Sequence, residues 1–207
     1  MAAADVSSVQ ERDLLSRARG GDRDAFGELV RRYEKKVLAL TSRMCRNSED
    51  GEEAAQEAFL AAWQNLPGFR GDAAFSTWLY RLASNASTDL LRREGRRSAR
   101  NGPSLDDEEG WLELPDSGPS PQALAERSEL KGQIEAALQK LSPDHRRVLI
   151  LREIHQLSYE EIGTALKLDT GTVKSRISRA RGRLRKILLQ SGNFSLYAPS
   201  NATENRG

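Results

Sequence analysis

Apolar residues three and four positions apart recur almost without a break from about residue 12 to residue 93. This spacing places them on one face of an α-helix. Leu and Ala together number 51, whereas Val and Ile together number 12, which favours helices over strands. The sequence therefore predicts an all-α fold, with residues 1–11, which precede the pattern, as a loose tail.

Local signals divide the first half of the chain into three helices. Asp22 is expected to cap the first of them. The second covers residues 49–64, and a Pro-Gly pair ends it at the start of a loop over 67–74. Ser76 is then expected to cap the third helix.

Residues 99–121 interrupt the helical pattern with four prolines and six acidic side chains. Such a composition is typical of an extended linker. It is predicted to join two small helical domains, residues 12–98 and residues 122–190. Residues 191–207 are polar and aperiodic, so a disordered C-terminal tail is expected there.

The most specific local pattern is a helix-turn-helix over residues 158–186. Ser158 and Glu161 have the spacing of a capping box, which predicts a helix from the next residue onward. A short turn follows, and Asp169 or Thr170 is expected to cap the second helix. Two short helices joined in this way allow the second to enter the major groove of DNA.

Charge is segregated along the chain although the net charge is only +2. Residues 171–190 carry seven Lys and Arg side chains and no acid. A solvated basic face is the alternative interpretation, but the capping box, the turn and the one-sided charge together favour DNA binding. The face of this helix that would meet DNA carries Lys174, Ser175, Arg176, Arg179, Arg183 and Arg185.

A second nucleic-acid surface is expected in the first half of the chain, where four of the twelve aromatic residues lie in one short stretch beside two arginines. Single-stranded nucleic acid binds to such surfaces because rings stack on bases and cations attract phosphates. Phe69 and Arg70 lie in the predicted loop, and Asn85 and Arg92 follow on the next helix. Trp78 falls on the apolar stripe and is expected in the core.

An acidic patch on the second predicted helix admits three interpretations: a metal site, a solvated face or a protein-docking face. No histidine or aspartate partner is evident for a metal, which favours the other two. The carboxylates of this patch include Glu52, Glu53 and Glu57, and both a solvated face and a docking face remain open for them.

Several classes of protein are disfavoured. A single cysteine, Cys45, leaves no internal disulfide and no cysteine-based zinc site. No apolar run is long enough to span a membrane, and the N-terminus lacks the pattern of a secretion signal. Nucleophile triads and phosphate-binding glycine loops are not evident. A cytoplasmic protein that is not an enzyme and needs no cofactor or metal is expected.

The chain resembles the bacterial extracytoplasmic-function (ECF) sigma factors of RNA polymerase, in particular the sigma-E-like group. The resemblance covers about residues 12–187 and is carried by four ordered blocks at residues 21–37, 53–59, 69–85 and 141–185. It implies that residues 12–98 form sigma region 2 and residues 122–190 form sigma region 4.

The resemblance also implies roles for the predicted residues. The family usually begins its polymerase-docking block with aspartate, and here the residues that would dock on core RNA polymerase are Glu53, Gln56, Glu57 and Phe59. The loop and helix that would recognise and open the promoter −10 element carry Phe69, Arg70, Asn85 and Arg92. The helix-turn-helix has Gly163 and Thr164 where the family often has alanines, and it would read the −35 element through Lys174, Ser175, Arg176 and Arg179.

Regulation and two competing functions complete the hypothesis. The resemblance implies an anti-sigma factor, which would hold the protein at the inner membrane. An ordinary repressor or activator and a helical adaptor with a solvated basic helix are the alternatives. Duplex binding separates the three, because a repressor binds DNA alone, a sigma factor binds specifically mainly with polymerase, and an adaptor does neither.

Overall fold

The computed structural model describes residues 2–101 and 121–190, with side chains over 9–97 and 128–190. Every element in these ranges is helical, which confirms the all-α prediction. The predicted linker falls almost wholly outside the described residues, and so does the predicted tail at 191–207. The first half comprises α1 (Ala2–Arg19), α2 (Arg23–Met44), α3 (Ser48–Asn65), η1 (Leu66–Gly68) and α4 (Phe75–Asn101). The second half comprises α5 (Pro121–Gln139), α6 (Pro143–Leu149), η2 (Ile150–Ile154), α7 (Tyr159–Leu166) and α8 (Thr170–Gln190).

Helix α1 corrects the prediction for the N-terminus, because it includes residues 2–11, which were expected to be a loose tail. Several of its side-chain contacts are tertiary. Leu14 and Leu15 lie against the core, and the Tyr33 hydroxyl of α2 donates a hydrogen bond to Glu11 Oε2 at 2.5 Å. The local pattern missed this helix because its stabilising partners lie on α2.

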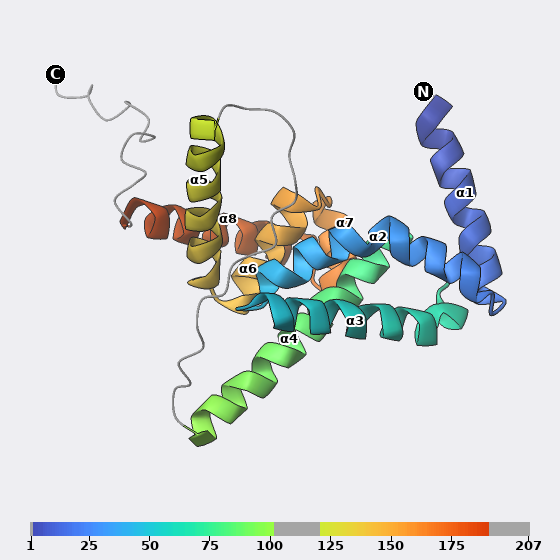
Figure 1. The fold of residues 1–207 in the computed structure, drawn as a ribbon, viewed down its shortest axis with the longest axis horizontal. Coiled ribbons are helices and arrows are strands. Elements are labelled where there is room, and N and C mark those ends of the chain that lie inside the picture. The colour runs from blue at the N-terminus through green and yellow to red at the C-terminus, as the bar shows by residue number, and fades with distance from the viewer. Residues whose placement is uncertain (1, 102–120, 191–207) are drawn as a thin grey trace.

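Helices α2, α3 and α4 lie against one another and form the core of the first half (Figure 1). The predicted cap of α2 is confirmed, since Asp22 Oδ1 accepts a hydrogen bond from the Ala25 N–H at 3.0 Å. The predicted cap of α4 is wrong: α4 begins at Phe75, so Ser76 lies inside its first turn. The first turn closes two residues earlier than predicted, through Trp78 N–H to Ala74 O at 3.1 Å.

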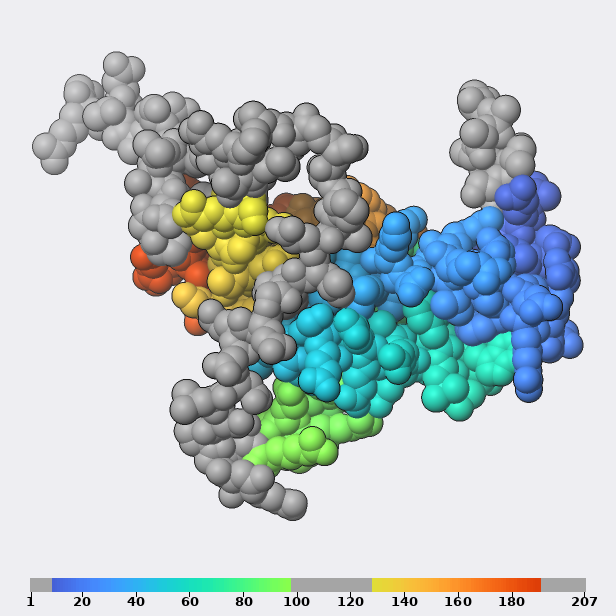
Figure 2. All heavy atoms as spheres, in the orientation of Figure 1, coloured from blue at the N-terminus to red at the C-terminus, as the bar shows by residue number. Residues whose placement is uncertain are grey.

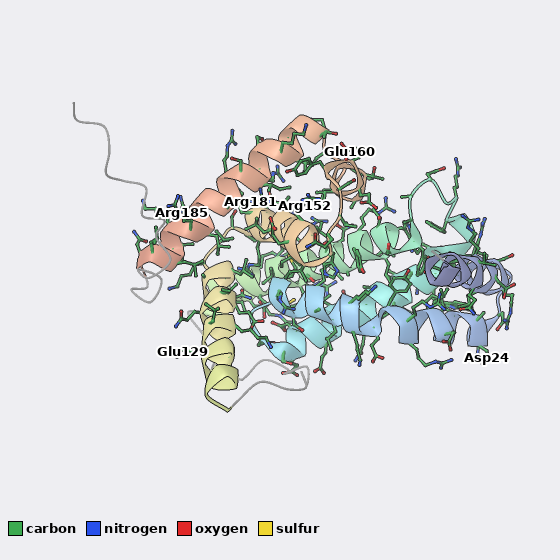
Figure 3. The ribbon with its side chains drawn as sticks, turned by 90° about the horizontal axis from the view of Figure 1, so that it is seen from above. Asp24, Glu129, Arg152, Glu160, Arg181 and Arg185 are labelled. Atoms are coloured by element: carbon green, nitrogen blue, oxygen red, sulfur yellow. The ribbon has the colours of Figure 1, made fainter. Side chains whose placement is uncertain are left out.

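In the second half, α6, α7 and α8 surround a core that includes Val148, Ile162 and Ile177, all buried. Ser142 occupies the N-cap position of α6 without a capping hydrogen bond from its side chain, and a proline follows it. The helix continues without a break into the π-helical turn η2. Helices α6 and α7 thereby hold α8 along one edge of the molecule (Figure 3).

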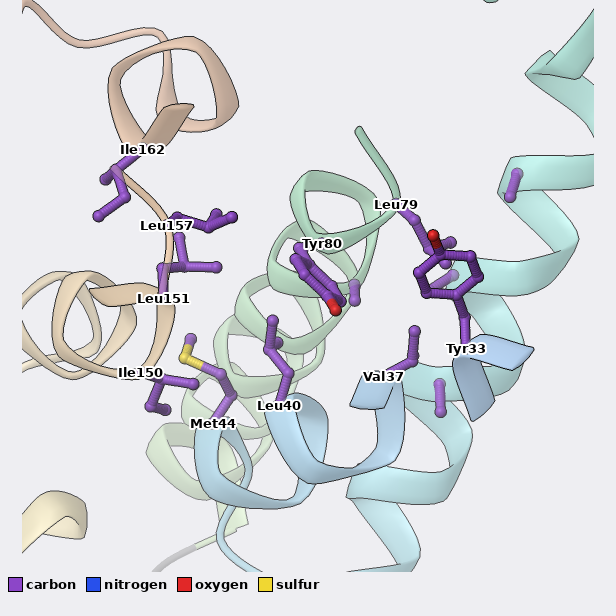
Figure 4. Close-up of a cluster of buried hydrophobic side chains, with 14 of the residues drawn as sticks. Tyr33, Val37, Leu40, Met44, Leu79, Tyr80, Ile150, Leu151, Leu157 and Ile162 are labelled. Carbon is purple, nitrogen blue, oxygen red and sulfur yellow. The ribbon is translucent and has the colours of Figure 1, made fainter. Parts of the chain in front are cut away.

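The two halves share one buried apolar cluster. Leu40 and Met44 of α2 lie beside Ile150 and Leu151 of the second half, and all four are fully buried (Figure 4). The chain therefore folds as two helical units with a joint core across their interface.

Polar contacts also cross this interface. Gln139 Nε2 donates hydrogen bonds to the carbonyls of Arg43 at 3.2 Å and Cys45 at 2.6 Å, and a third such contact comes from Arg146 of α6. Its guanidinium donates hydrogen bonds to four backbone carbonyls: Met44 at 2.5 Å, Gln139 at 2.7 Å, Leu138 at 3.0 Å and Leu141 at 3.3 Å. Met44 ends α2 and Gln139 ends α5, so these carbonyls include groups without a partner inside their own helices. One buried cation therefore joins the C-terminal ends of two helices, one from each half.

Candidate nucleic-acid interface

The helix-turn-helix is built by the two caps that the sequence predicts. Ser158 Oγ accepts a hydrogen bond from the Glu161 N–H at 3.1 Å, and Glu161 Oε2 accepts one from the Ser158 N–H at 2.7 Å. At the start of α8, Asp169 Oδ1 accepts a hydrogen bond from the Thr172 N–H at 2.7 Å. Of the two predicted caps for this helix, Asp169 is the one that forms, since Thr170 is already helical.

The turn between the two helices explains why a glycine stands in α7. Lys167 takes the left-handed conformation with φ of 55°, and the Leu168 N–H donates a hydrogen bond to Gly163 O at 2.9 Å. A Cβ at Gly163 would lie 2.8 Å from the carbonyl oxygen of Leu168. The glycine lets the turn close tightly over the end of α7.

Helix α8 separates an apolar face from a cationic face, as predicted. Val173, Ile177 and Ala180 are buried, whereas most of its Lys and Arg side chains extend into solvent (Figure 3). Arg181 and Arg185 lie along its length in this view. The cationic face therefore continues beyond the turn of the helix-turn-helix.

The four predicted contact residues on α8 differ in their partners. Arg176 is partly buried and lies 3.5 Å from Asp144, and the Lys174 ammonium lies 5.8 Å from the centre of the Tyr159 ring. Ser175 Oγ donates a hydrogen bond to a backbone carbonyl of its own helix at 3.0 Å. Arg179 is exposed and forms no ion pair with the described residues.

The loop of the first half places two predicted residues differently from one another. Phe69 is partly buried, and its ring centre lies 4.9 Å from that of Trp78 and 5.9 Å from that of Phe75. Trp78 is also partly buried, so both rings belong to one cluster at the edge of the core. Arg70 is exposed beside this cluster. The sequence prediction had separated Phe69 in the loop from Trp78 in the core, and the structure joins them.

Asn85 and Arg92 lie farther along α4, so the four predicted residues do not form one compact pocket. Asn85 follows the start of α4 by roughly 15 Å at the rise of an α-helix. Its Oδ1 accepts a hydrogen bond from Arg147 Nη2 of the second half at 2.6 Å. Arg92 is exposed and lies 3.2 Å from Asp89, one turn away.

On α3, the predicted docking residues divide between the surface and the helix interface. Glu53 and Gln56 are exposed, whereas Phe59 lies against the core and Glu57 pairs with Arg93 of α4 at 3.2 Å. Figure 2 shows α3 at the surface of one face of the molecule. The sequence prediction missed Leu60, which is 58% exposed. Its place outside the stripe of buried alanines was the available signal.

Comparisons with known proteins identify both halves. Residues 29–97 match the family model for sigma-70 region 2, and residues 131–184 match the one for sigma-70 region 4. The chain is 41% identical over 174 residues to the ECF RNA polymerase sigma-E factor of Escherichia coli, covering 81% of this chain and 88% of the relative. The chain belongs to the ECF sigma factors.

Two further likenesses agree with this assignment. The sigma factor is 40% identical over 186 residues to the RNA polymerase sigma-H factor of Pseudomonas aeruginosa, covering 88% of this chain and 96% of the relative. Its fold is similar to that of CnrH, solved in complex with the cytosolic domain of CnrY, with a TM-score of 0.63 and 29% identity. That likeness covers 89% of this chain and 99% of CnrH.

The interface between regions 2 and 4 of this sigma factor also holds a partly buried titratable group. The His155 ring centre lies 4.4 Å from that of Tyr80, and its buried Nε2 has no hydrogen-bond partner among the described residues. Burial, reinforced by the Arg43 and Lys36 cations, lowers the pKa of His155 to about 4. The imidazole is therefore neutral at neutral pH.

Within the part of the chain that the structure describes, no group of three His, Cys, Asp or Glu side chains is placed to hold a metal ion. In the same residues, no helix has the length and apolar character needed to cross a membrane.

Proposed function

We propose that this sigma factor binds core RNA polymerase and directs transcription initiation, with region 4 reading the −35 element and region 2 opening the −10 element. The observation that carries the proposal is the presence of both sigma regions in one chain. In region 4 the helix-turn-helix is intact, and its second helix, α8, exposes a cationic face. In this role the sigma factor itself makes and breaks no covalent bond.

For the −35 element, Arg179 is the strongest of the four candidates for reading a base. Its guanidinium is exposed and forms no ion pair with a carboxylate among the described residues, so no such contact has to break before it binds DNA. Arg176 must exchange its contact with Asp144 for DNA, and Lys174 already lies over an aromatic ring. We assign Lys174 and Arg176 to phosphates or to bases after that exchange, and Ser175 to a short-range polar contact.

The −35 assignment is tested by comparing Arg179→Ala with Arg181→Ala. Arg181 is a matched control because it lies on the same helix but pairs with Glu153 at 2.6 Å. Loss of a bidentate base contact costs roughly 1–3 kcal/mol and relaxes preference at one position, whereas loss of a phosphate contact is uniform across sequences. Holoenzyme binding to duplex promoters carrying each −35 substitution distinguishes these results. Equal effects of the two variants would contradict the assignment.

For the −10 element, the exposed Arg70 and the ring cluster behind it resemble the combination that binds unpaired bases. Stacking on a protein ring contributes ~1–3 kcal/mol per base, comparable to the few kcal/mol needed to extrude one base. Because Phe69 also stabilises Trp78 and Phe75, a suitable variant is Phe69→Leu, which keeps apolar contact and removes the stacking surface. It should reduce transcription from a duplex promoter, and a template already melted across the −10 element should restore it.

We assign polymerase docking to the exposed face of α3 formed by Glu53, Gln56 and Leu60, which lie three and four residues apart. Glu57→Lys is an ambiguous test because it would place two cations together beside Arg93. Glu53→Lys avoids this, and Glu34→Lys on α2 is its matched control, since Glu34 is also exposed. Weakened core binding by the first variant alone supports the assignment.

Arg147 occupies one acceptor site of Asn85 Oδ1. If a base needs this acceptor, region 2 separates from region 4 at this point when the promoter binds through both regions. We assign a cytoplasmic location and control by an anti-sigma factor, in keeping with the ECF family and with the complex of CnrH with a cytosolic domain.

The decisive experiment is run-off transcription with purified core polymerase and a pool of genomic promoters. Discrete products that require the sigma factor are expected. Specific duplex binding by the protein alone, without such products, would instead support a repressor. If the protein shows neither activity, the adaptor hypothesis remains.

A further inference from the structure

A surface pocket lies between the C-terminal half of α1 and the loop that follows η1. It has a volume of about 540 Å³, and Leu15, Pro67 and Phe69 contribute its apolar lining. Figure 1 shows the end of α1 beside the end of α3, where η1 begins. The ring that we assign to −10 opening is therefore also one wall of a pocket whose opposite wall is α1.

The α1 wall carries two arginines. Arg12 and Arg19 line the pocket, both are exposed, and neither has an ion-pair partner among the described residues. They are seven residues apart, which places them on one face of the helix and separates them by roughly 10 Å along it. None of the lining residues is acidic, so the pocket has an apolar floor and a cationic rim.

These arginines differ from Arg17 on the same helix. Arg17 is held by Asp22 at 2.8 Å, where it supports the corner between α1 and α2. Arg19 in the last turn of α1 is also explained by attraction to the negative end of the helix dipole. That attraction does not account for Arg12, which lies two turns earlier. Lining the same pocket is the feature that Arg12 and Arg19 have in common.

We infer that Arg12 and Arg19 contact backbone phosphates of the opened −10 strand while an unpaired base enters the pocket beside Phe69. The inference rests on the proposed role of the 67–74 loop and extends it to α1, which precedes the residues that match region 2. The pocket volume lies within the ordinary range of small-ligand sites. Its combination of ring, apolar floor and cationic rim fits single-stranded DNA.

The test is the salt dependence of binding by holoenzyme, assembled from the full chain and core polymerase. The probe is a fluorescently labelled single-stranded oligonucleotide with the −10 sequence of a promoter found by run-off transcription. Each phosphate contact on single-stranded DNA contributes about 0.7 to the slope of log K against log salt. The double variant R12A/R19A should therefore lower the slope by about 1.4.

Two control variants separate the loss of these two charges from unfolding of α1 and from a general loss of positive charge. R12K/R19K keeps both charges and should retain the parental slope, which also shows that the helix tolerates substitution at these positions. R31A removes an exposed arginine of α2 that pairs with Glu28 at 2.6 Å and does not line the pocket. It should change the slope little. Core binding should be the same for all variants.

The outcomes separate this inference from the proposed function. If the parent chain directs run-off transcription but R12A/R19A keeps a slope within about 0.3 of the parental value, or R31A lowers it equally, the assignment of α1 is wrong. If the parent chain directs no transcription at all, the proposed function itself fails.

Discussion

Replacing Arg146 by Met should be among the most destabilising single changes in this protein. The substitution keeps an unbranched apolar stem but removes a donor from four carbonyl oxygens. Leu138 O keeps the hydrogen bond from the Leu141 N–H, and two of the other three belong to the terminal residues of α2 and α5. A buried polar group left unpaired costs about 1–3 kcal/mol. Relief of the desolvation of the guanidinium, whose burial lowers the pKa of Arg146 to about 10, offsets part of this sum. We expect a net loss of about 3–5 kcal/mol in the free energy of unfolding.

Urea unfolding followed by circular dichroism measures this loss, and Arg31→Met is the control. Arg31 is exposed and bonds only Glu28 of its own helix, so its loss should stay within about 0.5 kcal/mol. Arg146→Lys should recover only part of the stability, because one ammonium cannot reach acceptors on two helix ends. A loss below about 1 kcal/mol for Arg146→Met would refute the argument that these carbonyls depend on Arg146.

Four further outcomes follow from the structure. The pKa of His155 is lowered to about 4 from its ordinary 6.5, so its contribution to stability is complete above pH 6.5 and is lost as the pH falls toward 4. His155→Phe keeps the ring contact with Tyr80 and should reduce the pH dependence of the unfolding free energy, measured in urea, over this range. Gly51→Ala should destabilise by about 1–3 kcal/mol, since its Cβ would lie 2.8 Å from a backbone atom of α2. Gly95→Ala, at an open position of α4, should instead stabilise by about 0.5–1 kcal/mol, and thermal unfolding of the pair reads both signs. Ser158→Ala should cost about 1 kcal/mol in the same assay, and no change would mean that the capping box is not a significant source of stability.

Features encoded by neighbouring residues could be predicted from the sequence. The capping box at Ser158 and the cap at Asp22 each depend on a side chain and a backbone group three residues apart. The apolar stripe of α8 likewise needs only helical spacing. These elements and the family resemblance were sufficient for the fold class and for both sigma regions.

Features that depend on distant partners could not be predicted. The Arg147–Asn85 hydrogen bond joins residues 62 positions apart, and Arg146 reaches a carbonyl 102 positions away. No periodicity indicates which surface helix will lie against another. For the same reason α1 was missed, and no local pattern indicated that Phe69 would share a cluster with Trp78.

The Arg147–Asn85 contact has a thermodynamic consequence for the order of assembly. If promoter DNA needs the Asn85 oxygen that Arg147 occupies, a free chain binds the promoter with an affinity reduced by the fraction of molecules in which this contact is open. If core polymerase binds the open form in preference, it removes this reduction. Linkage then requires promoter DNA to tighten the hold of polymerase on the sigma factor by the same factor. Such reciprocity would make the sigma factor a poor DNA-binding protein in the absence of polymerase, and no separate inhibitor would be needed for this.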